Sequence, residues 1–213
     1  EGGRAAAETA TVPNAVLCNS VVDAWAKSRH PDSGPRALRI LDRMEKLHAA
    51  SGLGSVRPNA VTFTGVVSAL TDGGTKGAGE LTEALFSAMK AGGHLPERVP
   101  TAVYNALLRA WAKSSGSNDD DDDDNGRRAP ERAEAILDAM EEGRRRRWSG
   151  TMAVGGGTNE GGVLDHDAPP SPDRISYNTV LDAWARSSHP DRVVRARNVL
   201  ERMKKRGGGG TPS

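Results

Sequence analysis

One column of short polar residues recurs four times along the 213-residue chain and offers the clearest chemistry. A column here means the positions that coincide when four similar segments are aligned without gaps. The members of this column are Asn19, Thr64, Asn105 and Asn178. Amide and hydroxyl groups both donate and accept hydrogen bonds, so they suit a partner such as the edge of a nucleic-acid base. Such residues are unfavourable inside helices, which makes their recurrence in predicted helices informative.

Each polar residue belongs to a stripe along one helix face. In the first copy the stripe is Val16, Asn19, Asp23 and Lys27, at i, i+3, i+7 and i+11. The apolar members that begin the four stripes are Val16, Val61, Ala102 and Ile175. Three stripes end in a cation, and these cations are Lys27, Lys113 and Arg186, with Asp72 in the second copy. Stacked copies would align the stripes, and the cations could then neutralise phosphates along a strand.

An amphipathic helix positions each stripe, because a different face of every segment carries its apolar residues. In the first copy these are Cys18, Val21, Val22 and Trp25, at i, i+3, i+4 and i+7. A second helix of the same period follows each first helix and ends in a methionine; the four are Met44, Met89, Met140 and Met203. The tryptophans share the apolar columns, so we expect them in the core and not as base-stacking platforms; they are Trp25, Trp111 and Trp184.

Four helical hairpins predict an all-α solenoid, since a single hairpin cannot bury its apolar stripe alone. Met44 follows Asn19 by 25 residues, whereas Met140 follows Asn105 by 35. The longer third copy contains the six aspartates at 119–124, so the acidic run is predicted to be an insertion in a turn. Such a run repels itself and favours a hydrated, disordered loop.

The hairpins and insertions give the following expected organisation. The repeats are predicted at residues 13–57, 58–98, 99–142 and 172–206, with an acidic loop at 117–126 inside the third. Flexible segments are predicted for the tail at 1–12, the Gly- and Arg-rich insertion at 143–171 and the tail at 207–213. The arginines at 144–147 are interpreted as a solvated charge run within that insertion.

Composition excludes several classes of protein. Lys and Arg number 29 and Asp and Glu 28, so the net charge is +1, and the scaffold outside the acidic run is mildly basic. The single Cys18 excludes a disulfide framework and a multi-cysteine zinc site, which favours a reduced compartment. No apolar run approaches the length of a membrane span, so we expect a soluble protein. The chain begins at Glu1 and not at methionine, which indicates a fragment whose targeting segment lies outside it.

No constellation of catalytic residues is recognisable. His30-Pro31-Asp32 and His189-Pro190-Asp191 fall at the same turn of the repeat and are interpreted as turn residues, with the aspartate near a helix start. The glycines at 73–79 lack the Gly-Lys-Ser/Thr ending of a phosphate loop and follow a helix. We therefore expect no enzyme activity, no cofactor, no metal and no small-molecule substrate.

The repeat resembles a known family. Residues 58–64 read Pro-Asn-Ala-Val-Thr-Phe-Thr and residues 172–178 read Pro-Asp-Arg-Ile-Ser-Tyr-Asn, and each segment leads to a second helix ending in Met. These segments look like pentatricopeptide repeats, and all four hairpins share their register. Tetratricopeptide repeats would instead place Trp early in the first helix and a proline at the end of the second.

The resemblance implies a protein that binds single-stranded RNA and reads about one base per repeat with two or three side chains. In that family one polar residue near the start of the first helix and another at the end of the repeat contact the base. The first position corresponds to Asn19, Thr64, Asn105 and Asn178, and the second to Asn59, Pro100, Asp173 and Ser213. The apolar clamp beside the base corresponds to Val16, Val61, Ala102 and Ile175.

Further expectations come from the same resemblance. The pair Asn105 and Asp173 would favour uracil, whereas Pro100 has no side-chain hydrogen-bonding group, which makes the second repeat degenerate. The resemblance also implies RNA processing, stability or translation in a mitochondrion or plastid. The repeat spacings of this chain exceed the usual length of such solenoid units.

Alternative interpretations stay open. The same face could bind proteins without nucleic acid, as helical-repeat scaffolds do. The asparagines could bond backbone groups at the helix start, and the three cations could complement the helix dipole.

Overall fold

The computed structural model describes residues 13–114, 124–152 and 168–207. Within these ranges the chain is helical, and no strand occurs there, which confirms the predicted all-α class. The elements are α1 (Ala15–Ser28), α2 (Ser33–Ser51), η1 (Gly54–Val56), α3 (Ala60–Asp72), α4 (Ala78–Ala91), α5 (Thr101–Ser114), α6 (Asp124–Met152), α7 (Arg174–Arg186) and α8 (Arg192–Gly207).

Polar caps set the beginnings of three odd-numbered helices. The Asn14 side chain accepts a hydrogen bond from the backbone of Leu17 and caps α1. Asn59 and Asp173 cap α3 and α7, and each forms a reciprocal capping box with the residue three positions later. Such boxes satisfy backbone N–H groups that a helix start leaves unpaired. The two residues predicted to end a repeat therefore also fix where the next helix starts.

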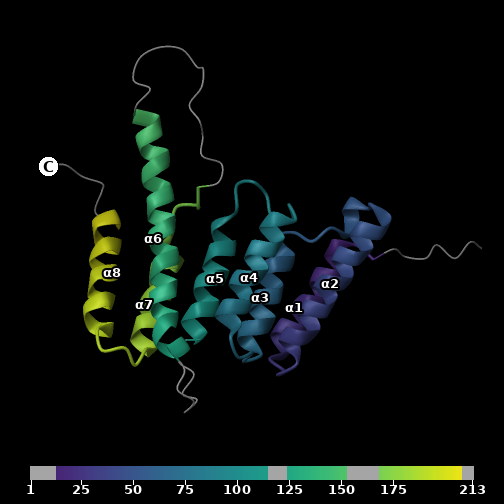
Figure 1. Ribbon diagram of the computed structural model, residues 1–213, viewed down its shortest axis with the longest axis horizontal. Coiled ribbons are helices and arrows are strands. Elements are labelled where there is room, and N and C mark those ends of the chain that lie inside the picture. The colour runs from purple at the N-terminus through teal and green to yellow at the C-terminus, as the bar shows by residue number, and fades with distance from the viewer. Residues whose placement is uncertain (1–12, 115–123, 153–167, 208–213) are drawn as a thin grey trace, which may run out of the picture.

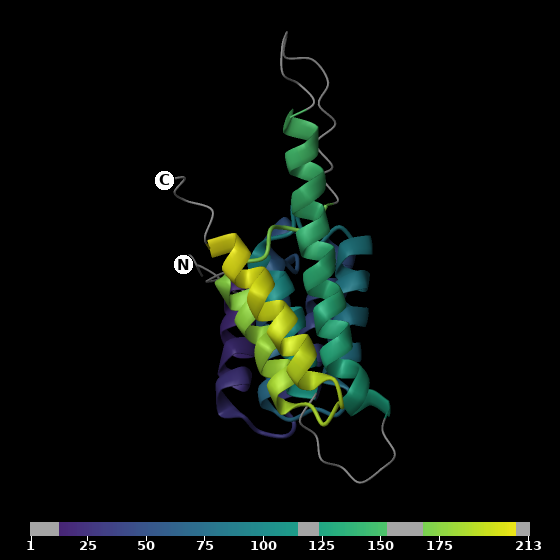
Figure 2. The ribbon, with the colours of Figure 1, turned by 90° about the vertical axis from the view of Figure 1, so that its left-hand side faces the viewer.

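The odd-numbered helices stand side by side in chain order. Helix α1 packs on α3, α3 on α5, and α5 on α7, so the hairpins follow one another along the long axis of the molecule (Figure 1). Figure 2 looks along this row from the end formed by α7 and α8. Helices α2, α4 and α6 each contact their own first helix and also the first helix of the next hairpin, as α2 does with α1 and α3, whereas α8 packs on α7. Neighbouring hairpins thereby share their buried surface.

The predicted apolar columns form the core. Phe63 and Trp184 are fully buried, and Trp111 is nearly so. The closing methionines Met44, Met89 and Met140 are likewise buried. Trp25, in the first hairpin, is only half-buried and stacks under the guanidinium of Arg36. The tryptophan column is thus core in the third and fourth hairpins, as predicted, and partly open in the first.

Glycines at the starts of α2 and α4 allow the close approach of the next hairpin. A Cβ at Gly34 would lie 2.9 Å from a methyl group of Leu70, and one at Gly79 would lie 2.5 Å from the ring of Trp111. Real Cβ atoms do not come that close to a ring carbon, so only glycine fits at this position of α4 without displacement of the core.

The third hairpin differs from its prediction. Helix α6 continues through residues 144–147 to Met152 and extends beyond its neighbours (Figures 1 and 2), so the segment expected to be flexible from 143 is helical up to 152. The expected acidic loop at 117–126 likewise overlaps the start of α6 at Asp124. Residues 119–123 of the acidic run, residues 153–167 of the insertion and the predicted tail at 1–12 lie outside the described residues. The tail predicted at 207–213 overlaps the end of α8 at Gly207, and its remaining residues also lie outside them.

The two His-Pro-Asp segments form the same turn before α2 and α8. The Asp32 backbone N–H donates to His30 Nδ1, and the Asp191 N–H donates to His189 Nδ1, both at 3.1 Å. In each case the helix begins at the next residue. Their interpretation as turn residues is confirmed.

Candidate nucleic-acid interface

The apolar residues that begin the stripes face solvent. The side chains of Val16, Val61 and Ile175 are 72%, 62% and 61% exposed, and Ala102 is also exposed. Branched apolar side chains this exposed contribute little to the core. Because the odd-numbered helices stand in a row, these residues form a line of exposed apolar groups along that row.

The junction between the first and second hairpins links the polar column to the helix cap. Thr62 Oγ1 donates to Asn19 Oδ1 at 2.8 Å. The same hydroxyl accepts from the Asn59 backbone N–H at 3.1 Å, and Asn59 Oδ1 in turn caps α3. Thr62 itself is fully buried. The two predicted base-contacting residues Asn19 and Asn59 are therefore joined through one buried hydroxyl.

The junction between the third and fourth hairpins has the same design and is tighter. Asn105 Nδ2 lies 3.2 Å from each carboxylate oxygen of Asp173 and donates to them. Ser176 Oγ donates to Asn105 Oδ1 at 2.7 Å and accepts from the Asp173 backbone N–H at 3.1 Å. The structure thus brings together the predicted pair Asn105 and Asp173, and the fully buried Ser176 holds both.

The environment of Asp173 keeps its carboxylate ionised. Burial alone would raise the pKa of Asp173, but hydrogen bonds from the Ser176 backbone and from Asn105 outweigh it and lower that pKa. A carboxylate that is ionised and partly exposed keeps lone pairs for an external donor.

The other two copies lack this arrangement. Thr64 Oγ1 donates to the Val61 carbonyl of its own helix. The residue that corresponds to Asp173 at this junction is Pro100, which has no side-chain hydrogen-bonding group. Asn178 is exposed, and its expected partner Ser213 lies outside the described residues. The alternative in which the asparagines bond the backbone at a helix start does not describe Asn19 or Asn105, whose side chains pair across hairpins.

Every cation at the end of a stripe is paired with a carboxylate. Lys27 Nζ lies 2.6 Å from Asp23 Oδ2, and Arg186 Nη2 lies 2.9 Å from Asp182 Oδ2, both one turn away on the same helix. Lys113 instead reaches the preceding hairpin and lies 2.5 Å from Asp72 Oδ1. All three cations also lie in the last turn of their helices, as the dipole interpretation expects.

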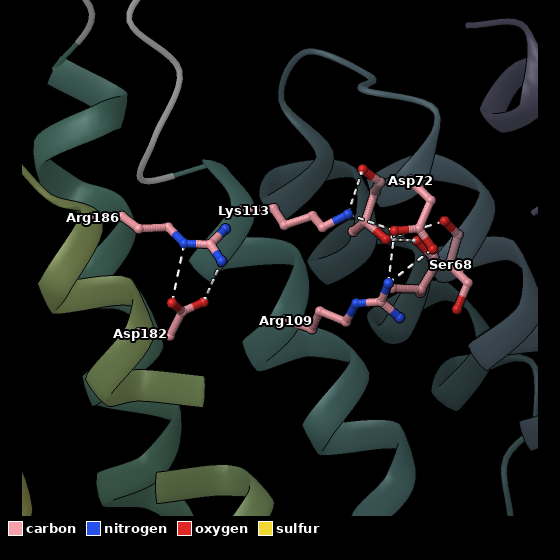
Figure 3. Close-up of polar contacts among 8 residues, drawn as sticks. Ser68, Asp72, Arg109, Lys113, Asp182 and Arg186 are labelled. Atoms are coloured by element: carbon pink, nitrogen blue, oxygen red, sulfur yellow. Dashed lines mark hydrogen bonds and ion pairs between the residues drawn. The ribbon is translucent and has the colours of Figure 1, made fainter. Parts of the chain in front are cut away.

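Asp72 is the point on which two basic side chains converge (Figure 3). Arg109 Nη2 donates to both of its carboxylate oxygens, at 2.6 and 2.8 Å, alongside Lys113. Partial burial would raise the pKa of Asp72, but the hydrogen bond from Lys113 and the charge of Arg109 lower it overall. The pairs of Lys27 with Asp23 and of Arg186 with Asp182 are exposed on both sides. Such pairs are worth only about 0–1 kcal/mol, so a polyanion can compete for these two cations.

An open depression of about 360 Å³ lies between the third and fourth stripes, and its lining comes from α5 and α7. Residues predicted from sequence to bind RNA contribute much of that lining: Lys113, Ile175, Asn178 and Arg186. Arg109 and Asp182 add a further cation and a carboxylate. An exposed amide, an apolar side chain and three cations thus surround one hollow.

Sequence reasoning missed the buried hydroxyls and Arg109. The hydroxyl column reads Leu17, Thr62, Val103 and Ser176. The available signal was the alternation of this column between apolar and hydroxyl residues. A hydroxyl occurs only where the polar residue of the preceding hairpin is Asn and the helix cap is Asn or Asp.

Other kinds of site find no support in the described part of the chain. No group of three or more His, Cys, Asp or Glu side chains there could hold a metal ion. Among the helices described, none combines the length and apolar character of a membrane span. The single Cys18 is a free, half-buried thiol. Comparison with protein-family models gives no match, and comparison with curated proteins gives no significant match.

Proposed function

We propose that this chain is a pentatricopeptide-like α-solenoid that binds single-stranded RNA sequence-selectively along the row of exposed stripes. The observation that carries the proposal is the paired junction. Two residues that sequence reasoning assigned to one base, Asn105 and Asp173, lie in hydrogen-bond contact although they are far apart in the chain. An equivalent linkage joins Asn19 to Asn59 through Thr62.

The chemistry of these junctions suits a base edge. At the third junction the amide of Asn105 is held in one orientation by Ser176 and Asp173, so its remaining hydrogen-bonding capacity points in a fixed direction. A preorganised donor and acceptor pair discriminates between bases better than a mobile one. The exposed Ile175, two residues after Asp173 at the start of α7, supplies an apolar surface for the face of a base.

The cations supply the sequence-independent part of binding. Lys113, Arg109 and Arg186 surround the hollow between α5 and α7, where a phosphate could replace Asp72 or Asp182 as their partner. By resemblance to pentatricopeptide repeats, the RNA would be an organellar transcript, in a mitochondrion or plastid, whose processing, stability or translation the chain directs.

A protein-binding scaffold is the second candidate. The observation that favours it is the internal neutralisation of the face, since Lys27, Lys113 and Arg186 already have carboxylate partners. A mixed-charge face with exposed apolar residues is also a surface that a peptide or protein could cover. This candidate predicts binding with weak salt dependence and no preference for single strands.

The test is selection of ligands from a random single-stranded RNA pool with the wild-type chain and with a variant of the third junction. The variant combines Asn105→Thr and Asp173→Asn, because both replacements already occur in these columns and Asn preserves the helix cap. We expect the enriched motif to change at one position. Asn198→Ala, at an exposed asparagine of α8 outside the stripes, is the matched control and leaves the motif unchanged.

Two results decide between the proposals. An unchanged motif at every position in the double variant contradicts the assignment of Asn105 and Asp173. Failure of the pool to yield any motif, together with equal binding of duplex DNA at low salt, contradicts RNA recognition itself and leaves the scaffold.

A further inference from the structure

Arginines gather at the edge of the row where the odd-numbered helices begin. The two helices of a hairpin run in opposite directions, so the starts of α5 and α7 share this edge with the far end of α6 (Figures 1 and 2). Arg98 precedes α5, and Arg174 is the first residue of α7. Three more arginines lie near the C-terminal end of α6. The five residues, which we call the arginine cluster, are Arg98, Arg144, Arg145, Arg146 and Arg174.

The segment that leads into α7 brings the members of the arginine cluster together. A Cβ at Gly143 would lie 2.7 Å from the carbonyl oxygen of Pro169, so α6 passes directly against this segment one residue before its first arginine. The same segment lines an open depression of about 290 Å³ together with Arg98, through Pro170 and the residue after it. Arg174 follows at the start of α7. Cations from three parts of the chain therefore surround one short stretch.

The arginine cluster differs from the cations that end the stripes, because most of its members have no carboxylate partner. Arg98, Arg144 and Arg174 are exposed, and within the described ranges none of the three forms an ion pair. The other two share a single carboxylate, that of Glu142, and their side chains are 66% and 65% exposed. An external anion can therefore bind here without first displacing a carboxylate from each cation, as it must at the ends of the stripes.

The arginine cluster stays positive when the neighbouring acids are counted. The carboxylates that adjoin it in the sequence are Glu97, Glu141, Glu142 and Asp173. Glu141 is already bound by Arg202 of α8, at 3.1 Å. Five arginines thus stand against three carboxylates that no other cation neutralises, which leaves a net charge of +2.

The opposite end of α6 is acidic. Asp124, the last of six consecutive aspartates in the sequence, begins this helix, and Arg144 lies about 30 Å further along it (Figure 1). Opposite charges at the two ends of one helix attract a polyanion to the arginine end and repel it from the other. A strand that leaves the row of stripes at the fourth hairpin is therefore drawn towards the arginine cluster.

We propose that the arginine cluster binds the phosphates of nucleotides that flank the motif read by the stripes. The inference rests on the proposed function, since it extends the path of the same RNA strand. Arg174 stands between Asp173 and Ile175, the two residues assigned to a base at α7. At most about 14 Å of extended chain separates Asp173 from Pro169, against which α6 packs just before its arginines. The phosphates next to a base read at α7 are thus within reach of the cluster.

The chemistry of arginine fits this ligand. A guanidinium group is always charged and presents N–H donors in a planar fork that matches the oxygens of a phosphate. Contacts to phosphates carry no sequence information, so the arginine cluster adds affinity without changing the motif. Flanking nucleotides of any sequence are therefore expected to serve.

Equilibrium binding of trimmed and extended RNA tests the inference. The trimmed RNA is the shortest that keeps the motif selected by the wild-type chain, and two longer forms carry about six added uridines on the 5′ or the 3′ side. With about three phosphates contacted on a single strand, we expect one longer form to bind about tenfold more tightly at about 50 mM salt. Its salt slope should be steeper by about 2, so the gain is lost by about 200 mM. The same extension made with uncharged methylphosphonate linkages is expected to give no gain.

Substitution of the α6 arginines locates the contact. The variant combines Arg144→Gln, Arg145→Gln and Arg146→Gln, because glutamine is a good helix former without a charge. We expect it to bind the trimmed RNA like wild type and to lose the gain from the extension. Circular dichroism checks its helix content, and if that falls, Arg98→Gln replaces it and is expected to lose part of the gain.

The matched control removes the same number of charges elsewhere. It combines Arg39→Gln, Arg43→Gln and Arg197→Gln, at exposed arginines of α2 and α8 that form no ion pair within the described part of the chain. The control is expected to keep the full gain from the extension.

Three results would overturn the inference and leave the proposed function standing. The first is a wild-type chain that binds the trimmed RNA and both longer forms equally well. The second is an equal gain from the uncharged extension. The third is a folded α6 variant that keeps the full gain, which would leave the arginine cluster to another anionic partner such as an acidic protein. A random pool that yields no motif at all would instead overturn RNA recognition, and this inference with it.

Discussion

Replacement of Ser176 by alanine removes the hydroxyl at the centre of the third junction. The single proton of that fully buried hydroxyl is directed at Asn105 Oδ1, 2.7 Å away, with Asp173 Oδ1 as a second acceptor at 3.0 Å, and the hydroxyl oxygen accepts from the Asp173 backbone N–H at 3.1 Å. Each hydrogen bond is worth about 1 kcal/mol net, and a buried group left unpaired costs about 1–3 kcal/mol. Because Asn105 and Asp173 are partly exposed and can bind water instead, we expect Ser176→Ala to destabilise the chain by about 2 kcal/mol.

Chemical unfolding followed by circular dichroism at equilibrium measures this loss. The matched control is Thr179→Val on the same helix, whose hydroxyl donates only to the Ile175 carbonyl of its own helix. We expect the control to change the unfolding free energy by less than about 0.5 kcal/mol. Equal effects of the two changes, or a loss of less than about 0.5 kcal/mol in Ser176→Ala, would refute the idea that the buried hydroxyl holds the junction together.

Two further substitutions test the packing and the charges. Gly79→Ala places a Cβ 2.5 Å from the Trp111 ring and is expected to lower the unfolding free energy by about 1–3 kcal/mol, whereas Gly54→Ala, with nothing within 4 Å, is expected to be nearly neutral in thermal unfolding. Asp72→Asn frees two cations and should tighten RNA binding about three- to tenfold in a low-salt titration. Asp72 has a lowered pKa when folded, so its contribution to stability is present above its unfolded pKa of about 4 and is lost as pH falls through the folded value. Acid unfolding of Asp72→Asn is accordingly expected to be shallower than that of wild type; an unchanged acid profile or an unchanged affinity would contradict the role of these ion pairs.

The helices and their buried faces were predictable because every hairpin repeats the same apolar columns. The columns of Phe63 and Met44 alone identify which face is buried, and the structure buries both residues. The extension of α6 was not predictable in the same way. Gly143 and the arginines after it have the composition of a loop, but arginine is a good helix former. A Cβ at Gly143 would meet Pro169, and this contact with a residue 26 positions later in the chain could not be read from local sequence.

Part of the candidate interface was likewise predictable from the sequence, and part was not. The pairing of Asn105 with Asp173 was expected from the resemblance to pentatricopeptide repeats, and the structure brings the two side chains into contact. The role of Ser176 depends on side-chain orientation across two helices, and the pairing of Asp72 with Arg109 joins residues on different hairpins. The pairing of Asp72 with Arg109 occurs at one junction and leaves no repeated signal in the sequence. The contact of Ser176 leaves only the alternation of the hydroxyl column, which becomes informative once the polar column and the cap are compared with it.

Equilibrium binding of the chain to one selected RNA, offered as a single strand and as a duplex at several salt concentrations, tests the central claim most directly. The account predicts that the single strand binds at least about tenfold more tightly than the duplex. If the cations Lys27, Lys113 and Arg186 each displace one counterion, the logarithm of the binding constant should fall with the logarithm of salt with a slope of about −2. Equal affinity for single strand and duplex, or binding that does not change with salt, would contradict the proposal that the chain binds single-stranded RNA along its stripes.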